Sequence, residues 1–115
     1  MPAPTVSPDQ LVLALSEDAY NGDAQFIAKM DGKQLGAAQS VTALNSAGKT
    51  QSFTSSGTWG AGPHKVEVDF TNDAFAGPGK DRNLTVDQVT YDGKAAMTQP
   101  STLWSNGGVT IAVHS

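Results

Sequence analysis

The sequence contains no cysteine among its 115 residues. A disulfide framework and a cysteine-based zinc site are therefore excluded. A single domain of this length can still bury a core large enough to fold without such cross-links. The absence of cysteine leaves the cellular compartment open, because cytoplasmic proteins and many bacterial secreted modules share it.

Positive charge is also scarce, with seven Lys/Arg against eleven Asp/Glu and a formal net charge of −4. No basic stripe runs along the chain, so nucleic acid and anionic membrane surfaces are not expected as partners. No apolar run approaches the ~20 residues that a membrane-spanning helix needs. The opening MPAPTVSPDQ lacks the charged and apolar regions of a signal peptide. We expect residues 1–9 to be a linker and residues 10–115 to be one module of a longer protein.

Helical periodicity is missing as well, because glycine and proline interrupt every helical window. His64–Phe70 and Val109–Val113 instead alternate polar and apolar residues, which is typical of half-buried strands. Leu11–Leu15 has the composition of a strand that is buried on both faces. Further candidate strands are 24–30, 39–44, 50–55 and 84–91. The sequence therefore predicts an all-β fold, an antiparallel two-sheet β-sandwich of jelly-roll type.

The period of two also predicts which side chains face the core. They are Val66, Val68, Phe70, Leu84, Val86, Ile111 and Val113. Three dipeptides signal hairpin turns, since Asp-Gly and Asn-Gly adopt positive φ at little cost: Asp31-Gly32, Asp92-Gly93 and Asn106-Gly107.

Catalytic machinery is not apparent. His64 shares a strand with Glu67 and Asp69, but alternation points the histidine to one face and the two acids to the other. The chain has two histidines and no neighbouring nucleophile, so a hydrolytic triad is not expected. An enzyme would need two close carboxylates in a deep cleft, and the sequence does not predict one.

Acidic residues gather in two glycine-rich stretches instead. Glu17–Asp23 and Asn72–Gly77 both contain Asp-Ala-aromatic-x-Gly, which suggests two similarly shaped loops that share a site. The longer segment FTNDAFAGPGKDRNLTVD carries several oxygen-bearing side chains around a Gly-Pro-Gly loop. Calcium takes six to eight such oxygens, although a solvated loop whose Asp and Asn residues bond their own backbone explains the same pattern.

The run from Val41 to Gly93 resembles the calcium-dependent xylan-binding modules of carbohydrate-binding module families 60 and 36, and Leu15–Gly36 resembles the part that precedes it. The carrying motifs are Gly-Asp-Ala followed by a strand and Asp-Gly, and Phe-Thr-Asn-Asp followed by Arg-Asn-Leu-x-Val-Asp. Such modules are small β-sandwiches appended to secreted polysaccharide-degrading enzymes. The resemblance implies a non-catalytic, secreted, monomeric module in which Ca²⁺ binds the vicinal O2 and O3 hydroxyls of a sugar.

The resemblance also implies a ligand set. Asp73 matches the acid that closes Phe-Thr-Asn-Asp, and Asn83 stands where the family pattern has a second carboxylate, with Asp81 one step earlier on the longer loop as its replacement. Asp18 and Asp23 complete the same site or hold a second, structural ion. The residues implied at the sugar are Tyr20, Phe75, Asn72 and Arg82, with Phe75 at a position where Trp or Tyr is expected. The expected glycan is xylan, with cello- and galacto-oligosaccharides as further ligands.

A second hypothesis stays open from the residues alone. The chain would then be a calcium-stabilised sandwich that serves as a spacer or adhesin module and binds no glycan. Calcium-dependent stability without glycan binding would distinguish it from the first hypothesis.

Overall fold

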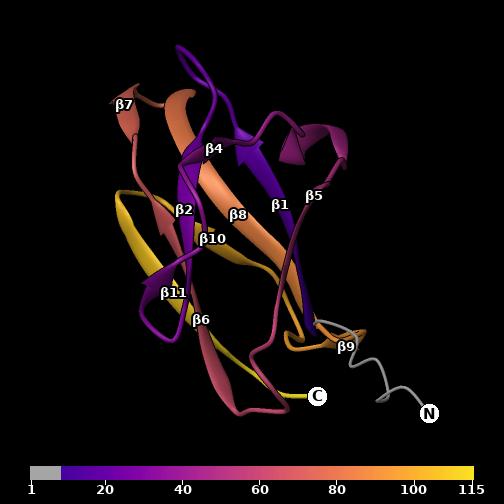
Figure 1. Ribbon diagram of the computed structural model, residues 1–115. Helices are drawn as coiled ribbons and strands as arrows, with labels where there is room; N and C mark the ends of the chain where they lie inside the picture. The colour runs from indigo at the N-terminus through magenta and orange to yellow at the C-terminus, as the bar shows by residue number, and fades with distance from the viewer. Residues whose placement is uncertain (1–8) are drawn as a thin grey trace, which may run out of the picture.

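The computed structural model describes residues 9–115 and arranges them in two antiparallel β-sheets (Figure 1). The first sheet has the order β10 (Ser101–Leu103), β8 (Lys80–Tyr91), β1 (Asp9–Asp18) and β5 (Gln51–Gly57), and β7 (Ala74–Gly77) and β9 (Lys94–Ala95) also pair with β8. The second has the order β11 (Gly107–Val113), β6 (His64–Phe70), β2 (Gln25–Met30) and β3 (Lys33–Gln34), with β4 (Gln39–Ser40) paired to β2. The two-sheet antiparallel sandwich predicted from the sequence is confirmed.

The core lies between the sheets and follows the predicted alternation. All seven side chains predicted to face inward are buried, from Val66 on β6 to Val113 on β11. They pack in one cluster with Leu11, Leu15 and Tyr91 of the first sheet. Burying each aliphatic or aromatic side chain of this kind stabilises the fold by about 1.5–3 kcal/mol.

The predicted turns are confirmed at two of three positions. Asp31 and Gly32 have φ of 51° and 84° and join β2 to β3, and Asp92 and Gly93, with φ of 49° and 81°, join β8 to β9. The hairpin predicted at Asn106-Gly107 is wrong, because β10 and β11 belong to different sheets. The amide of Asn106 instead accepts a hydrogen bond from the backbone N–H of Asp73 at 2.7 Å.

One strand boundary matters for function. β8 begins at Lys80, so the predicted loop position of Asp81 and Asn83 is wrong. Both residues lie near the start of this long strand, where Asn83 pairs with Asp18 of β1 and Asp81 pairs with Phe75 of β7. These two pairings hold the start of β8 extended.

Two further points concern elements that the sequence suggested or excluded. The predicted linker lies outside the described residues except for Asp9, which is the first residue of β1. The segment expected to be a strand at 39–44 is a strand only at Gln39–Ser40, and a short 3₁₀ turn, η1 (Asn45–Ala47), follows it. Within residues 9–115, no helix is long and apolar enough to cross a membrane.

Candidate functional site

Three polar side chains meet at the end of the sandwich where β1 finishes and β8 starts. Asp18 is the last residue of β1 and pairs directly with Asn83 on β8. Asp81 precedes Asn83 by two residues on the same strand. Because side chains alternate along a strand and paired residues share a face, all three side chains project from one face of the sheet.

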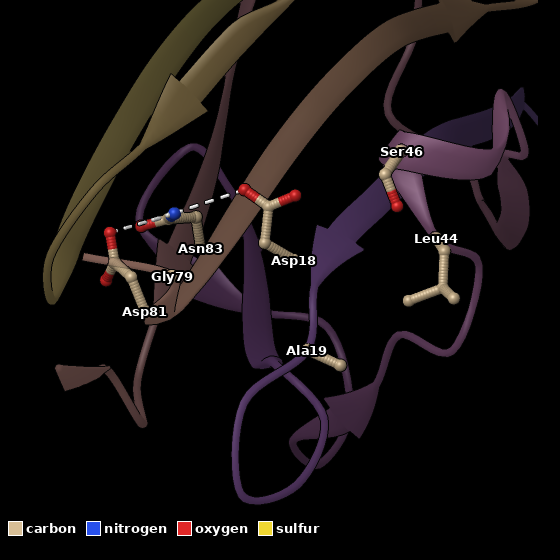
Figure 2. A pocket seen from close by; sticks show the side chains of 7 residues that line it. All are labelled: Asp18, Ala19, Leu44, Ser46, Gly79, Asp81 and Asn83. Atoms are coloured by element: carbon tan, nitrogen blue, oxygen red, sulfur yellow. Dashed lines mark hydrogen bonds between the residues drawn. The ribbon is translucent and has the colours of Figure 1, made fainter. Parts of the chain in front are cut away.

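Asn83 connects the two acids. Its Nδ2 donates to Asp18 Oδ2 and to Asp81 Oδ2, each at 3.1 Å (Figure 2). Two oxygens of the trio, Asp81 Oδ1 and Asn83 Oδ1, are buried and have no hydrogen-bond partner within residues 9–115. A buried oxygen without a donor costs about 1–3 kcal/mol. The trio is therefore rich in acceptors and short of positive charge, as expected of residues that hold a cation.

A cavity of about 550 Å³ opens beside these side chains. Besides Asp18, Asp81 and Asn83, it is lined by Ala19, Gly79, Leu44 and Ser46. Figure 2 shows Asp81 and Asn83 on one side of Asp18, and Leu44 and Ser46 on the other. The cavity thus has an acidic wall of strand residues and a neutral wall that begins at Leu44 and continues into η1.

The donor count at this wall leaves room for outside ligands. No group of three or more acidic, histidine or cysteine side chains is close enough to form a metal centre in residues 9–115. Asp18 and Asp81 therefore supply two carboxylates, and Asn83 can supply its amide oxygen if the amide turns. Calcium takes six to eight oxygens, so water, backbone carbonyls or a ligand's hydroxyls would fill the other positions.

Asp73, the acid that the motif pointed to, does not line this cavity. It lies just before β7, whose residue Ala74 pairs with Arg82 and whose Phe75 pairs with Asp81. Its Oδ1 is also buried and without a partner in the described part of the chain. Its part in binding an ion stays a prediction, and the free oxygen supports it.

Asp23 belongs to a different pair of acids. It is exposed, and its carboxylate faces that of Glu17, a fully buried residue on β1. Burial, together with the Asp23 carboxylate, raises the pKa of Glu17 to about 7, against the effect of the Ala24 N–H that donates to Oε1 at 2.6 Å. Glu17 Oε2 has no hydrogen-bond partner in residues 9–115.

Arg82 joins the loops that carry the acids. The side chain is 8% exposed, and its guanidinium donates to the carbonyls of Tyr20, Asn21 and Asn72 at 2.6–3.1 Å. These bonds tie the loop after β1 to the loop after β6. The two acid-aromatic stretches noticed in the sequence are thus adjacent in the fold. The structure assigns Arg82 a positioning role, and its contact with a ligand stays a prediction.

The other implied contact residues differ in how available they are. The Asn72 amide already bonds backbone, accepting from Gln25 N and donating to the Asp23 carbonyl. Tyr20 is half-buried, with its carbonyl on Arg82. Phe75 is 67% exposed beside Asp81 on the neighbouring strand. Of these, Phe75 has the more exposed aromatic ring.

Sequence reasoning missed Glu17, Leu44 and Ser46. Glu17 precedes Asp18 and therefore points to the opposite face of β1, away from the cavity and into the protein. The available signal for Glu17 was that it occupies an inward-facing position of a buried strand, where a carboxylate is unusual. Leu44 and Ser46 had no signal, because long-range contacts with β1, such as the parallel bridge between Leu44 and Glu17, bring them to the site.

Comparisons with known proteins agree with this architecture. Residues 10–106 match the sequence profile of family CBM60, described as a Ca-dependent, xylan-binding carbohydrate-binding module. A structure described as vCBM60 in complex with galactobiose is similar, with 19% identity, a TM-score of 0.63, and 90% of this chain and 97% of that chain covered. A second similar structure is a selenomethionine form of vCBM60, described with a circular permutation that links two families of calcium-dependent carbohydrate-binding modules. It is 18% identical, with a TM-score of 0.63, and the match covers 92% of this chain and 90% of that chain.

No curated protein matches the chain. The family match spans most of the sequence, and the similar structures share its β-sandwich. The modules of this family bind carbohydrate and catalyse no reaction, which agrees with the missing nucleophile and acid–base pair. The chain belongs to the CBM60 family of carbohydrate-binding modules.

Proposed function

We propose that this module binds xylan and related β-glycans through a calcium ion that coordinates vicinal hydroxyls of the sugar. The observation that carries the proposal is the pair of buried, unpartnered oxygens, Asp81 Oδ1 and Asn83 Oδ1, which belong to two residues that line the cavity. A cation is the partner that such oxygens lack. The family description as Ca-dependent and xylan-binding supports the choice of ion and glycan.

Calcium would be held by Asp18, Asp81 and the amide oxygen of Asn83. In the structure the Asn83 NH₂ group lies between the two carboxylates and donates to both. With an ion, rotation of the amide would turn its oxygen inward, since the two ends of an amide are nearly equal in shape. Asp73 and backbone carbonyls of the same loops would supply further oxygens.

The sugar would complete the coordination. A neutral diol competes with water for the ion, so few protein contacts are needed and affinity stays modest. We expect dissociation constants of roughly 10 μM to 1 mM, equivalent to about −4 to −7 kcal/mol. Recognition through two hydroxyls also tolerates several glycans, so cello- and galacto-oligosaccharides are expected as weaker ligands. Phe75 and Tyr20 are the aromatic residues offered to the sugar, with Asn72 and Arg82 beside them.

Glu17 and Asp23 favour a second, structural cation. Glu17 is fully buried with Oε2 unpartnered, and Asp23 brings a second carboxylate to it from the adjoining loop. An ion here would neutralise a buried charge and join β1 to that loop. Calcium would then stabilise the sandwich, as in the second hypothesis, and would also mediate glycan binding.

The setting of the module is proposed on the same basis. We infer that residues 10–115 act as one monomeric module of a larger secreted protein, with residues before them as a linker. The family's usual place beside polysaccharide-degrading enzymes supports this setting.

Calorimetric titration of xylohexaose tests the proposal, first in millimolar calcium and then in excess chelator. Binding should vanish in chelator while circular dichroism still reports the sheets. Asp81→Asn should lose binding in calcium, and Asp31→Asn, at the other end of the sandwich, is the matched control that should retain it. Undiminished binding in chelator would overturn the mechanism.

A further inference from the structure

The neutral wall of the cavity contains an exposed leucine in an unusual position. Leu44 is 40% exposed, yet it lies beside the most polar cluster of the site and lines the same cavity as Asp18 and Asp81. An isolated exposed leucine needs no explanation, but one that faces a polar cavity is available to the ligand. We propose that Leu44 selects pentopyranosides over hexopyranosides, an inference that rests on the proposed calcium-dependent binding at this site.

The backbone around Leu44 is held in place from three directions. Glu17 N donates to the carbonyl of Ala43 at 2.9 Å, which attaches the segment to β1. The carbonyl of Leu44 accepts from Ala47 N and Lys49 N, each at 3.1 Å, and Gly48 closes the turn with φ of 70°. The backbone at Leu44 is therefore held by hydrogen bonds within the protein on both sides of the residue.

Two consecutive side-chain hydrogen bonds anchor Asn45, the residue after Leu44. Asn45 Nδ2 donates to Ser16 Oγ at 3.0 Å, and Ser16 Oγ donates to Asp87 Oδ2 at 2.7 Å. Ser16 and Asp87 belong to β1 and β8, the strands that also carry the acidic wall. The same two strands thus position both walls, so the gap between the acids and Leu44 is set by the sheet.

The structure of a pyranose ring determines which part of the sugar would face Leu44. When O2 and O3 face the ion on the acidic wall, the edge across the ring is formed by C5 and O5. Leu44 lines the same cavity as Asp18 and Asp81, and Figure 2 shows it on the other side of Asp18 from Asp81. A ring whose O2 and O3 face the acids would therefore present its C5–O5 edge toward the wall that contains Leu44. In a xylopyranose C5 is an apolar methylene, whereas in a glucopyranose it carries a hydroxymethyl group.

Leu44 would favour the C5 methylene of xylopyranose and disfavour the hydroxymethyl group of glucopyranose. A methylene against the leucine removes apolar surface from water, which is favourable. A hydroxymethyl group there would place its hydroxyl against a side chain that forms no hydrogen bond, and it would lose contact with water without a replacement. Within residues 9–115, this wall has one polar lining residue, Ser46, whose hydroxyl lies on η1. Preference for the pentose therefore follows from the wall opposite the ion.

Titration calorimetry with xylotriose and cellotriose at saturating calcium tests the inference, since the two ligands differ only in the hydroxymethyl groups. The wild-type module should bind xylotriose at least about threefold more tightly. Leu44→Ala should weaken xylotriose binding by about three- to tenfold and leave cellotriose binding unchanged or improved. Leu44→Met, which keeps an apolar side chain of similar volume, should retain the preference.

The outcomes separate this inference from the proposed function. Calcium affinity and Tm should be unchanged in both variants, because the Leu44 side chain contributes no oxygen and is partly exposed. Calcium-dependent binding with the same xylotriose to cellotriose ratio in the wild type and Leu44→Ala would overturn the selective role of Leu44 alone, as would a wild type without preference. Glycan binding that persists in chelator, or no binding in calcium, would overturn the proposed function and this inference with it.

Discussion

The two ends of the sandwich treat their carboxylates in opposite ways. At the end opposite the cavity, Asp31 accepts from Lys65 N at 2.8 Å and faces His64 Nδ1 at 2.6 Å, and Asp9 accepts from Gly60 N at 2.6 Å. At the cavity end, Asp81, Asn83 and Glu17 each keep a buried oxygen without a partner in residues 9–115. The acids at the first end are hydrogen-bonded within the protein, whereas residues at the cavity end keep unpartnered oxygens, and this difference supports the proposal of a cation site at the cavity end.

The difference is visible in the pKa values as well. The backbone N–H of Lys65 and then the His64 ring hold the pKa of Asp31 below its usual value, and Gly60 N–H does the same for Asp9. Burial moves the pKa of Glu17 in the other direction, to about 7. A carboxylate with a lowered pKa stabilises the fold as an anion, whereas a buried carboxylate with a raised pKa is more stable when it binds a proton or a cation.

The largest expected effect comes from the residue that assembles the cavity end. Arg82→Ala removes a buried guanidinium and leaves three backbone carbonyls without their donor, so it should lower the free energy of unfolding by about 2–4 kcal/mol. Urea unfolding in chelator measures this. Lys29→Ala is the matched control, since Lys29 makes only partly exposed ion pairs with Glu67 and Asp69 at 3.6 Å and should cost at most about 0.5 kcal/mol. Equal losses for the two variants would contradict the positioning role of Arg82.

The next effect compares one acid from each end. Asp18→Asn should weaken calcium binding at least about tenfold, because it removes one of the two carboxylates at the acidic wall. Asp31→Asn should leave calcium binding unchanged and lower stability instead, because its hydrogen bonds are internal. Calcium titration followed by calorimetry measures both. The comparison between the ends would fail if the two variants bound calcium equally well.

A smaller effect is expected at the second pair of acids. Glu17→Gln keeps the shape of the side chain and removes its charge, so the rise in Tm on adding calcium should shrink while xylohexaose still binds. The stoichiometry of calcium binding should fall from two ions to one. Thermal unfolding with and without calcium, together with equilibrium dialysis, provides the measurement. An unchanged Tm shift would mean that Glu17 holds no ion.

The smallest effect is the pH dependence of the opposite end. The Asp31 carboxylate raises the pKa of His64 above 6.5, so the stability from the charged ring is complete below pH 6.5 and is lost as pH rises through that raised pKa. The lowered pKa of Asp31 adds stability above about pH 4 that is lost as pH falls through that lowered pKa. The contribution of this pair to Tm should therefore have its maximum between about pH 4 and 6.5, and it is measured in chelator as the difference between the wild type and Asp31→Asn, because the titration of Glu17 is common to both. Asp31→Asn should flatten this maximum, and a profile that the variant leaves intact would exclude the pair as its source.

Local pattern was a good guide to the sandwich and to part of the site. Alternation in His64–Phe70 predicted a strand with Val66, Val68 and Phe70 inward, and all three are buried, because burying them is favourable in only one register. Asp-Gly predicted two hairpins, since positive φ is a property of the residues themselves. The prediction of a hairpin at Asn106-Gly107 was wrong, because the same dipeptide also occurs where the chain crosses from one sheet to the other, as it does between β10 and β11.

Site assembly depended on contacts that no local pattern encodes. Asp18, Asp81 and Asn83 were among the predicted ligands, and the structure brings these three together while placing Asp23 against Glu17. Which acids share a site was decided by the register of β1 on β8, fixed by the burial of their inward faces. Composition and motif thus determined the sandwich and the wealth of oxygen donors at its loops. Tertiary structure alone decided which oxygens stay unpartnered and brought Leu44 to face them, because strand register and loop packing are set by burial across the whole core.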